Sequence, residues 1–181
     1  FKNAVKISDK SLFNAAVDDL VGLGQGLTPS GDDFLVGFIS ASHFFTQLRK
    51  NPRTKSVDKC VGCPPCQFCR QTKLGGMCSD VRSEGSMPSN PFAFFLKNVK
   101  INHSKTNFIS SQYLKYAVEG KISEVISNTI VSSAEKKSDA VGWISELANT
   151  GATSGYDTLF GIFSAIGVYN ACKCHKQKFL S

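Results

Sequence analysis

Long hydrophobic runs are missing from this chain of 181 residues, although 41% of its residues are hydrophobic. No stretch approaches the roughly 18–20 consecutive apolar residues of a membrane-spanning helix, so the sequence predicts no membrane span. The alternation of apolar and polar residues that marks a half-buried strand is missing too. We therefore predict a mainly α-helical bundle, with residues 1–181 forming a single domain around one core.

An initiator methionine and a signal-peptide pattern are also absent, because the chain begins Phe1-Lys2-Asn3. We interpret the chain as the C-terminal part of a longer, cytoplasmic protein. The sequence has no Ser–His–Asp or Cys–His arrangement that would support a covalent nucleophile. Any catalysis is therefore expected to act through positioning and charge stabilisation.

Positive charge exceeds negative charge, with 21 Lys and Arg against 14 Asp and Glu. A basic protein of this kind can bind nucleic acid. The aromatic residues, however, are mostly Phe at apolar positions and are not interleaved with the basic residues as a stacking platform requires. We favour a lysine-rich surface that tolerates anionic small molecules, and nucleic acid is not the expected partner.

Seven cysteines form an odd and clustered set, which argues against a secreted disulfide framework. Four of them follow one another at a fixed step of three, at Cys60, Cys63, Cys66 and Cys69. The run lies in an irregular insert rich in Cys, Pro and Gly, predicted to cover residues 50–91. It could hold zinc or an iron–sulfur cluster, or it could be a loop of reduced thiols without metal. No cofactor is certain from these residues, and both readings stay open.

Helical periodicity accounts for most of the remaining chain. A first helix is predicted over residues 8–23, with Leu12 inward and with Ser8 or Ser11 as caps. Further helices are predicted to start at Ser30, after Pro91, at Ser110 or Ser111, near residue 122, at Ser138 and at the turn that follows Gly151. The inward faces include Tyr113, Val141 and Phe163.

The most informative feature is a motif that occurs twice. The first copy reads GLTPSGDDFLVG (residues 26–37) and the second reads GATSGYDTLFG (residues 151–161). When Pro29 is skipped, both follow the pattern Gly-x-Thr-Ser-Gly-x-Asp-x-Leu-x-Gly. Each copy places a turn rich in glycine and hydroxyls directly before an apolar helix.

Two interpretations of the motif compete. Ser30 with Asp33, and Ser154 with Asp157, have the spacing of a capping box, which needs no ligand. The motif is longer than capping requires, however, and glycines precede the first copy. Helix starts with unshielded amides bind anions well, so we favour two turns that face one another around a small anion.

The second interpretation names the candidate site. The predicted catalytic residues are Asp32, Asp33 and Asp157. The predicted substrate-binding residues of the two turns are Gly24, Gly26, Thr28, Ser30, Gly31, Thr153, Ser154 and Gly155. Asp32 has no acidic counterpart in the second copy, where Tyr156 stands, so it could accept hydrogen bonds from a carbamoyl NH2 or hold a metal.

The run over residues 22–37 resembles the signature of the AllH-type family, formerly a domain of unknown function. Residues 106–120 and 151–161 are similar to two further motifs of that family. The resemblance covers most of residues 8–49 and 104–170, and the Cys-rich stretch 50–90 departs from it. It implies a subunit of oxamate carbamoyltransferase, an enzyme of allantoin and purine breakdown built from several different subunits.

The resemblance also implies the ligands. They would be oxalurate and phosphate, interconverted with oxamate and carbamoyl phosphate, and all of them are small anions. Thr106 and Ser110 join the predicted site only on the strength of this resemblance. The alternative, from a different class, is a metal-stapled basic module that binds nucleic acid or a protein partner.

Overall fold

A computed structural model describes residues 1–50 and 90–178, which form helices and loops without any strand. In chain order the elements are α1 (Lys2–Ile7), α2 (Lys10–Leu20), α3 (Ser30–Lys50), α5 (Pro91–Asn98), the 3-10 turn η2 (His103–Lys105), α6 (Phe108–Val118), α7 (Glu124–Glu135), α8 (Ala140–Ala148) and α9 (Ser154–Lys178). The predicted helical bundle is confirmed. None of the helices in these ranges combines the length and the apolar character needed to cross a membrane.

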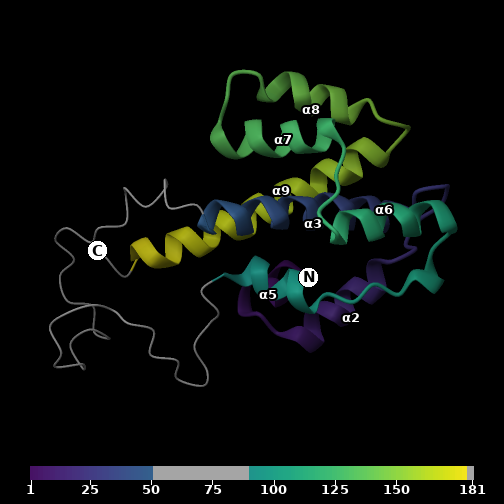
Figure 1. The fold of residues 1–181 in the computed structure, drawn as a ribbon, viewed down its shortest axis with the longest axis horizontal. Helices are drawn as coiled ribbons and strands as arrows, with labels where there is room; N and C mark the ends of the chain where they lie inside the picture. Colours follow the sequence, from purple (N-terminus) through teal and green to yellow (C-terminus); the bar gives the residue numbers. More distant parts are fainter. Residues whose placement is uncertain (51–89, 179–181) are drawn as a thin grey trace, which may run out of the picture.

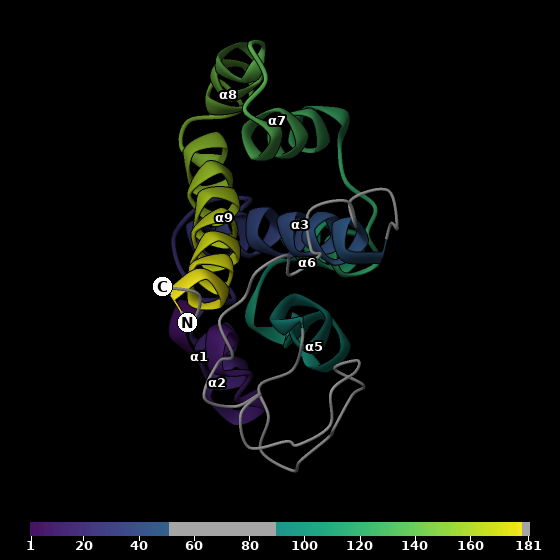
Figure 2. The same ribbon diagram turned by 90° about the vertical axis from the view of Figure 1, so that its left-hand side faces the viewer.

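The two helices that carry the repeated motif lie at the centre. Figure 1 shows α3 and α9 across the middle, with α7 and α8 on one side of them and α1, α2 and α5 on the other. Figure 2, turned by 90°, shows that α3 and α9 cross rather than run parallel. The core beside them is rich in phenylalanine, and its fully buried rings are Phe13, Phe38, Phe45, Phe92 and Phe95.

The N-terminal region differs from the prediction in both its boundaries and its buried face. Ser8 adopts a left-handed conformation (φ 57°) that ends α1, and the Asp9 side chain accepts a hydrogen bond from the Leu12 amide to start α2. Neither Ser8 nor Ser11 is the cap of this helix. Leu12 is 51% exposed, whereas Phe13 and Val17 are fully buried. The predicted apolar face of this helix was therefore wrong by one residue. The larger Phe13 side chain and its partners fill the core in place of Leu12.

Two of the later helices begin at a short polar side chain that accepts a hydrogen bond from a backbone amide of the first turn. Asn107 caps α6 through the Ser110 amide, and Ser123 caps α7 through the Ile126 amide. Ser110 and Ser111 are therefore not helix caps, and α8 follows Asp139 rather than Ser138. Of the side chains expected inside, Tyr113, Val141 and Phe163 are exposed by 54%, 76% and 43%.

Candidate functional site

The two copies of the repeated turn meet in space. The Thr28 hydroxyl, just before α3, lies 2.7 Å from the hydroxyl of Ser154, the first residue of α9. These residues are 126 positions apart in the chain, so the contact results from tertiary packing. The central geometric prediction, that the turns converge, is confirmed.

Glycines inside the motif allow this convergence. A Cβ atom at Gly37 would collide with the Thr158 carbonyl of α9, and a Cβ at Gly161 would collide with the Phe34 carbonyl of α3. The two contacts are reciprocal, so the helices cross backbone against backbone at equivalent points of the motif. Their first turns are thereby held side by side.

A second pair of glycines seats each motif helix on the helix that precedes it. A Cβ at Gly31 would strike the Leu20 carbonyl at the end of α2, and a Cβ at Gly155 would strike the Leu147 carbonyl near the end of α8. Both glycines were predicted to keep helix-start amides unshielded for a ligand. The structure gives a different reason for them, namely close packing on neighbouring backbone.

The amides of Gly31, Asp32, Asp33 and Gly155 already donate hydrogen bonds within the chain. The Gly31 amide donates to the Leu23 carbonyl, and the amides of Asp32 and Asp33 donate to the Pro29 carbonyl. In the second copy, the Gly155 amide donates to the Thr150 carbonyl at 2.9 Å. The prediction of unshielded, ligand-ready peptide hydrogens at these positions was wrong, because the turns satisfy them internally.

Asp32 is fully enclosed and ties three segments together. Its carboxylate accepts hydrogen bonds from the Gly22 amide at 2.8 Å, from the Ser110 hydroxyl at 2.6 Å and from the Thr106 hydroxyl. The side chain is 0% exposed. Thr106 and Ser110 therefore lie at the site but bond to Asp32, which joins the glycine loop and the start of α6 to α3.

Asp33 and Asp157 occupy equivalent positions, one in each motif helix, and each has a buried carboxylate oxygen, Oδ2, without a hydrogen-bond partner. Burial raises the pKa of Asp33 from 3.8 to about 6; the hydroxyls of Ser154 and Thr28 oppose this rise, and the charges of Asp157 and Asp32 add to it. Asp33 thus meets a hydroxyl of the opposite turn, where a capping box would fold it back onto its own helix start.

The other predicted site residues line the same region with differing exposure. Gly24 and Gly26 lie in the exposed loop before α3, both with positive φ (116° and 102°). Ser30 is half-buried and Thr153 is exposed. The structure thus gathers the predicted hydroxyls and carboxylates in one place. Cys60, Cys63, Cys66 and Cys69 lie outside the described residues, so a metal on them stays a prediction.

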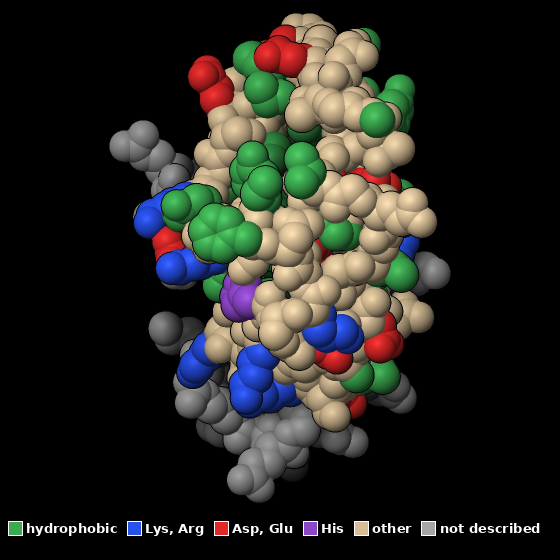
Figure 3. All heavy atoms as spheres, turned by 90° about the vertical axis from the view of Figure 1, so that its right-hand side faces the viewer, with side chains coloured by type: hydrophobic (Ala, Val, Ile, Leu, Met, Phe, Trp, Pro, Cys, Tyr) green, Lys and Arg blue, Asp and Glu red, His purple; other side chains and the backbone are tan. Residues whose placement is uncertain are grey.

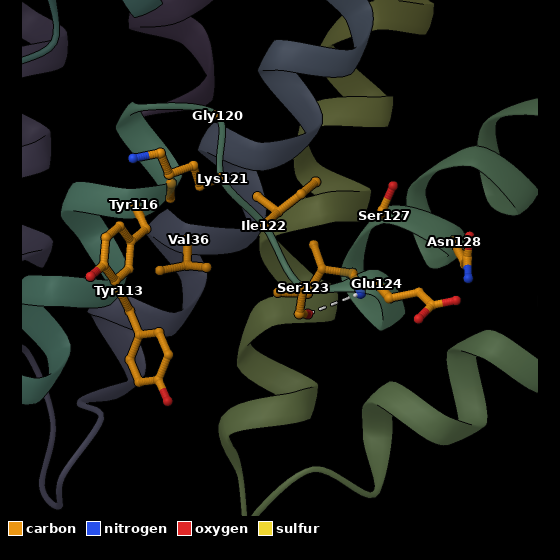
Figure 4. A pocket seen from close by; sticks show the side chains of 12 residues that line it. Val36, Tyr113, Tyr116, Gly120, Lys121, Ile122, Ser123, Glu124, Ser127 and Asn128 are labelled. Carbon is orange, nitrogen blue, oxygen red and sulfur yellow. Dashed lines mark hydrogen bonds between the residues drawn. The ribbon is translucent and has the colours of Figure 1, made fainter.

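A hollow of about 840 Å3 lies elsewhere, where the end of α6 meets the start of α7. Figure 4 shows Tyr113 and Tyr116 of α6 beside Val36 of α3, with Lys121 next to Tyr116 and Glu124 further along. The sequence analysis missed this hollow because it placed Tyr113 in the core. Tyrosine at both positions was the available signal, since its hydroxyl favours a half-exposed site.

The comparisons with known proteins agree with the repeated motif. A family model described as "oxamate carbamoyltransferase subunit AllH" matches residues 20–67 and 72–166. The match includes most of the Cys-rich stretch 50–90. The prediction that this stretch departs from the family was therefore wrong, except over the short gap between the two matched ranges. The chain matches no curated protein and no solved structure significantly. Since the match takes in both copies of the motif and most of the chain, this protein belongs to the AllH family of oxamate carbamoyltransferase subunits.

Proposed function

We propose that this chain is the subunit of a carbamoyl-transferring enzyme that binds the small anionic substrate, and that the paired turns form the binding site. The reaction would interconvert oxalurate and phosphate with oxamate and carbamoyl phosphate. Membership of the AllH family supports the carbamoyl-transfer chemistry. The observation that carries the location is the 2.7 Å contact between Thr28 and Ser154, which joins the two copies of the motif.

In this proposal the hydroxyls of the two turns bind the substrate. Thr28, Ser30, Thr153 and Ser154 supply four hydroxyl groups on the two adjoining turns, and hydroxyls can donate to phosphate or carboxylate oxygens. Asp32 acts as a positioning residue, because it fixes the glycine loop and the start of α6 around the site. Holding two reactants in one orientation is itself a large source of rate enhancement.

The charge of the site sets a condition on this proposal. Asp32, Asp33 and Asp157 lie close enough for their charges to influence one another. A small anion would be repelled by these carboxylates unless a positive charge stands between them. The bound state therefore needs a compensating cation or proton.

Assembly with other subunits is the second part of the proposal. Exposed hydrophobic side chains lie on the segments that form the paired turns and α6: Leu27 is 70% exposed, Tyr156 64% and Phe108 78%. Figure 3, which faces the end where these segments lie, shows hydrophobic side chains clustered on the surface. Contiguous exposed apolar surface is typical of an interaction site. The family is one of enzyme subunits, so partner subunits are the expected occupants.

Calorimetric titration of the chain with inorganic phosphate, carbamoyl phosphate, oxamate and oxalurate tests the proposed site. We expect binding of at least one of them, weakened about tenfold by Ser154→Ala, because a hydrogen bond to a charged group contributes roughly 1.5–3 kcal/mol. Ser138→Ala, which removes an exposed hydroxyl outside both turns, is the matched control. Equal affinity of the wild-type and Ser154→Ala chains would place the ligand elsewhere.

A further inference from the structure

Two carboxylate oxygens at the paired turns have no hydrogen-bond partner among the described residues. Oδ2 of Asp33 and Oδ2 of Asp157 are both buried and make no hydrogen bond, and the Asp33 side chain is only 8% exposed. Buried polar atoms in folded proteins are nearly always paired, and leaving one unpaired is costly. Two such atoms at equivalent motif positions indicate a partner that the described residues do not supply.

The two carboxylates belong to one electrostatic cluster. Each lies in the first turn of its helix, and the helix starts meet at Thr28 and Ser154. The charges of Asp157 and Asp32 both raise the pKa of Asp33, so Asp33 lies within electrostatic reach of each of them. Asp32 already has its three internal donors, which leaves Asp33 and Asp157 as the pair with free oxygens.

No basic side chain of the described residues neutralises this cluster. The ion pairs among the described residues join Lys105 to Asp18, Lys121 to Glu119 and Lys137 to Glu135. None of them includes Asp32, Asp33 or Asp157. A compensating charge would therefore be a proton or a cation that the ion pairs of the described residues do not provide.

We propose that Asp33 and Asp157 together bind a divalent cation that prefers oxygen ligands, Mg2+ or Mn2+, where the two turns meet. Its role toward the substrate rests on the proposed function: the cation would bind the phosphate or carboxylate oxygens that the bare carboxylates repel. The hydroxyls of Thr28 and Ser154, both of which lower the pKa of Asp33, offer two neutral oxygens beside it.

The donor set selects this class of ion. Only oxygen atoms are available, which suits Mg2+ and Mn2+ and not the softer metals that favour thiolate or imidazole. Mg2+ is commonly held by one or two carboxylates, with water and substrate phosphate completing its shell. Within the described residues no group of three or more His, Cys, Asp or Glu is placed to hold a metal, so a closed zinc site is not formed here.

Titration of the reduced, metal-free 181-residue chain with Mn2+, followed by the electron paramagnetic resonance signal of free Mn2+, tests the proposal. We expect one Mn2+ per chain, displaced by Mg2+. Asp33→Asn and Asp157→Asn should each weaken binding about tenfold or more, since even indirect partners of a metal contribute 10- to 100-fold. Asp19→Asn removes the same charge from an exposed position outside the turns and should bind as the wild type does.

A measurement on the unmodified chain guards against misfolded variants. Bound Mn2+ should broaden the amide resonances of Thr28, Asp33 and Ser154 before those of Ala93 and Ile130. Absence of Mn2+ binding, or equal binding by the wild-type, Asp33→Asn and Asp157→Asn chains, would overturn the proposed cation site.

Two outcomes of these titrations distinguish the cation site from the proposed function. Phosphate or carbamoyl phosphate that binds equally well with Mn2+ and with excess EDTA would support the substrate site and overturn the cation site. Mn2+ that binds at Asp33 and Asp157, with no binding of any of the four anions, would support the cation site and contradict the proposed function.

Discussion

Thr28 and Ser154 lie with their hydroxyls 2.7 Å apart, although 126 positions separate them in the chain. Each stands at the start of one motif helix, so this contact joins the two copies of the repeat. The junction also holds Asp33 and Asp157, whose buried oxygens are unpartnered. A pair of helix starts built only for capping would satisfy these oxygens locally. The unsatisfied oxygens therefore favour the proposed binding site over two independent caps.

The crossing of α3 and α9 can be tested with a pair of glycines that differ only in their surroundings. Gly37→Ala should reduce the free energy of unfolding by about 1–3 kcal/mol, because its Cβ would collide with the Thr158 carbonyl. Gly167→Ala, in α9 with nothing near its Cβ, should raise it by about 0.5–1 kcal/mol through helix propensity. Denaturant unfolding measures both. Equal effects of the two substitutions would show that the helices do not cross at Gly37.

Asp32 is predicted to hold the start of α6 against α3. Asp32→Asn replaces an acceptor for three donors with an amide that must itself donate, so we expect a loss of about 2–3 kcal/mol in unfolding free energy. Hydrogen exchange should become faster at the Gly22 amide, which loses a charged acceptor. Asp19→Asn provides the matched control. An unchanged rate of hydrogen exchange at the Gly22 amide would contradict this role of Asp32.

Asp33 makes stability depend on pH in a defined direction. Its pKa in the folded chain is about 6, above the ordinary value of 3.8, so the folded state binds this proton more tightly than the unfolded state does. The contribution of the Asp33 proton to the unfolding free energy is complete below the pKa of the unfolded chain. It is lost as pH rises through the pKa of the folded chain. In metal-free buffer, the unfolding free energy of the wild type minus that of Asp33→Asn should therefore increase as pH falls from about 7 to about 4. A difference independent of pH would show that Asp33 titrates normally.

The exposed hydrophobic side chains are predicted to affect assembly and not folding. Phe108 is 78% exposed, so Phe108→Ser should change the unfolding free energy by no more than about 0.5 kcal/mol. Phe38 is fully buried, and Phe38→Ala should reduce the unfolding free energy by about 3–5 kcal/mol. Sedimentation of the chain mixed with its partner subunits should show weaker assembly with Phe108→Ser. Assembly equal to that of the wild type would exclude Phe108 from the interface.

The start of α3 at Ser30 and the convergence of the two turns followed from the sequence, and the buried residues Phe38, Ala41 and Phe45 of α3 keep a helical period. The reason is that the motif repeats at length and that the α3 stripe is strongly periodic. The stripe of α2 was wrong by one residue, since Leu12 and Phe13 both satisfy a helical period and only packing decides between them. The caps at Asn107 and Asp139 were missed because several Ser, Asn and Asp residues precede each helix.

The chemistry at the helix starts could not be predicted from the motif. Whether the Gly31 amide is free depends on the Leu23 carbonyl, and the position of that carbonyl is set by the fold of the glycine loop. In the same way, the enclosure of Asp32 depends on Thr106 and Ser110, which reach it only in the folded chain. Motif spacing indicated which residues of the two turns would lie together, and tertiary contacts assigned their partners.

The replacement of Asp32 by Tyr156 in the second copy has a consequence for any ligand with two unlike ends. Perfectly equivalent halves would accept such a molecule in either direction with equal affinity. Here one half holds an enclosed, fully hydrogen-bonded carboxylate, while the other presents an aromatic ring that is 64% exposed. The two halves of the proposed site are therefore unlike, and an asymmetric ligand is expected to bind there in one direction only.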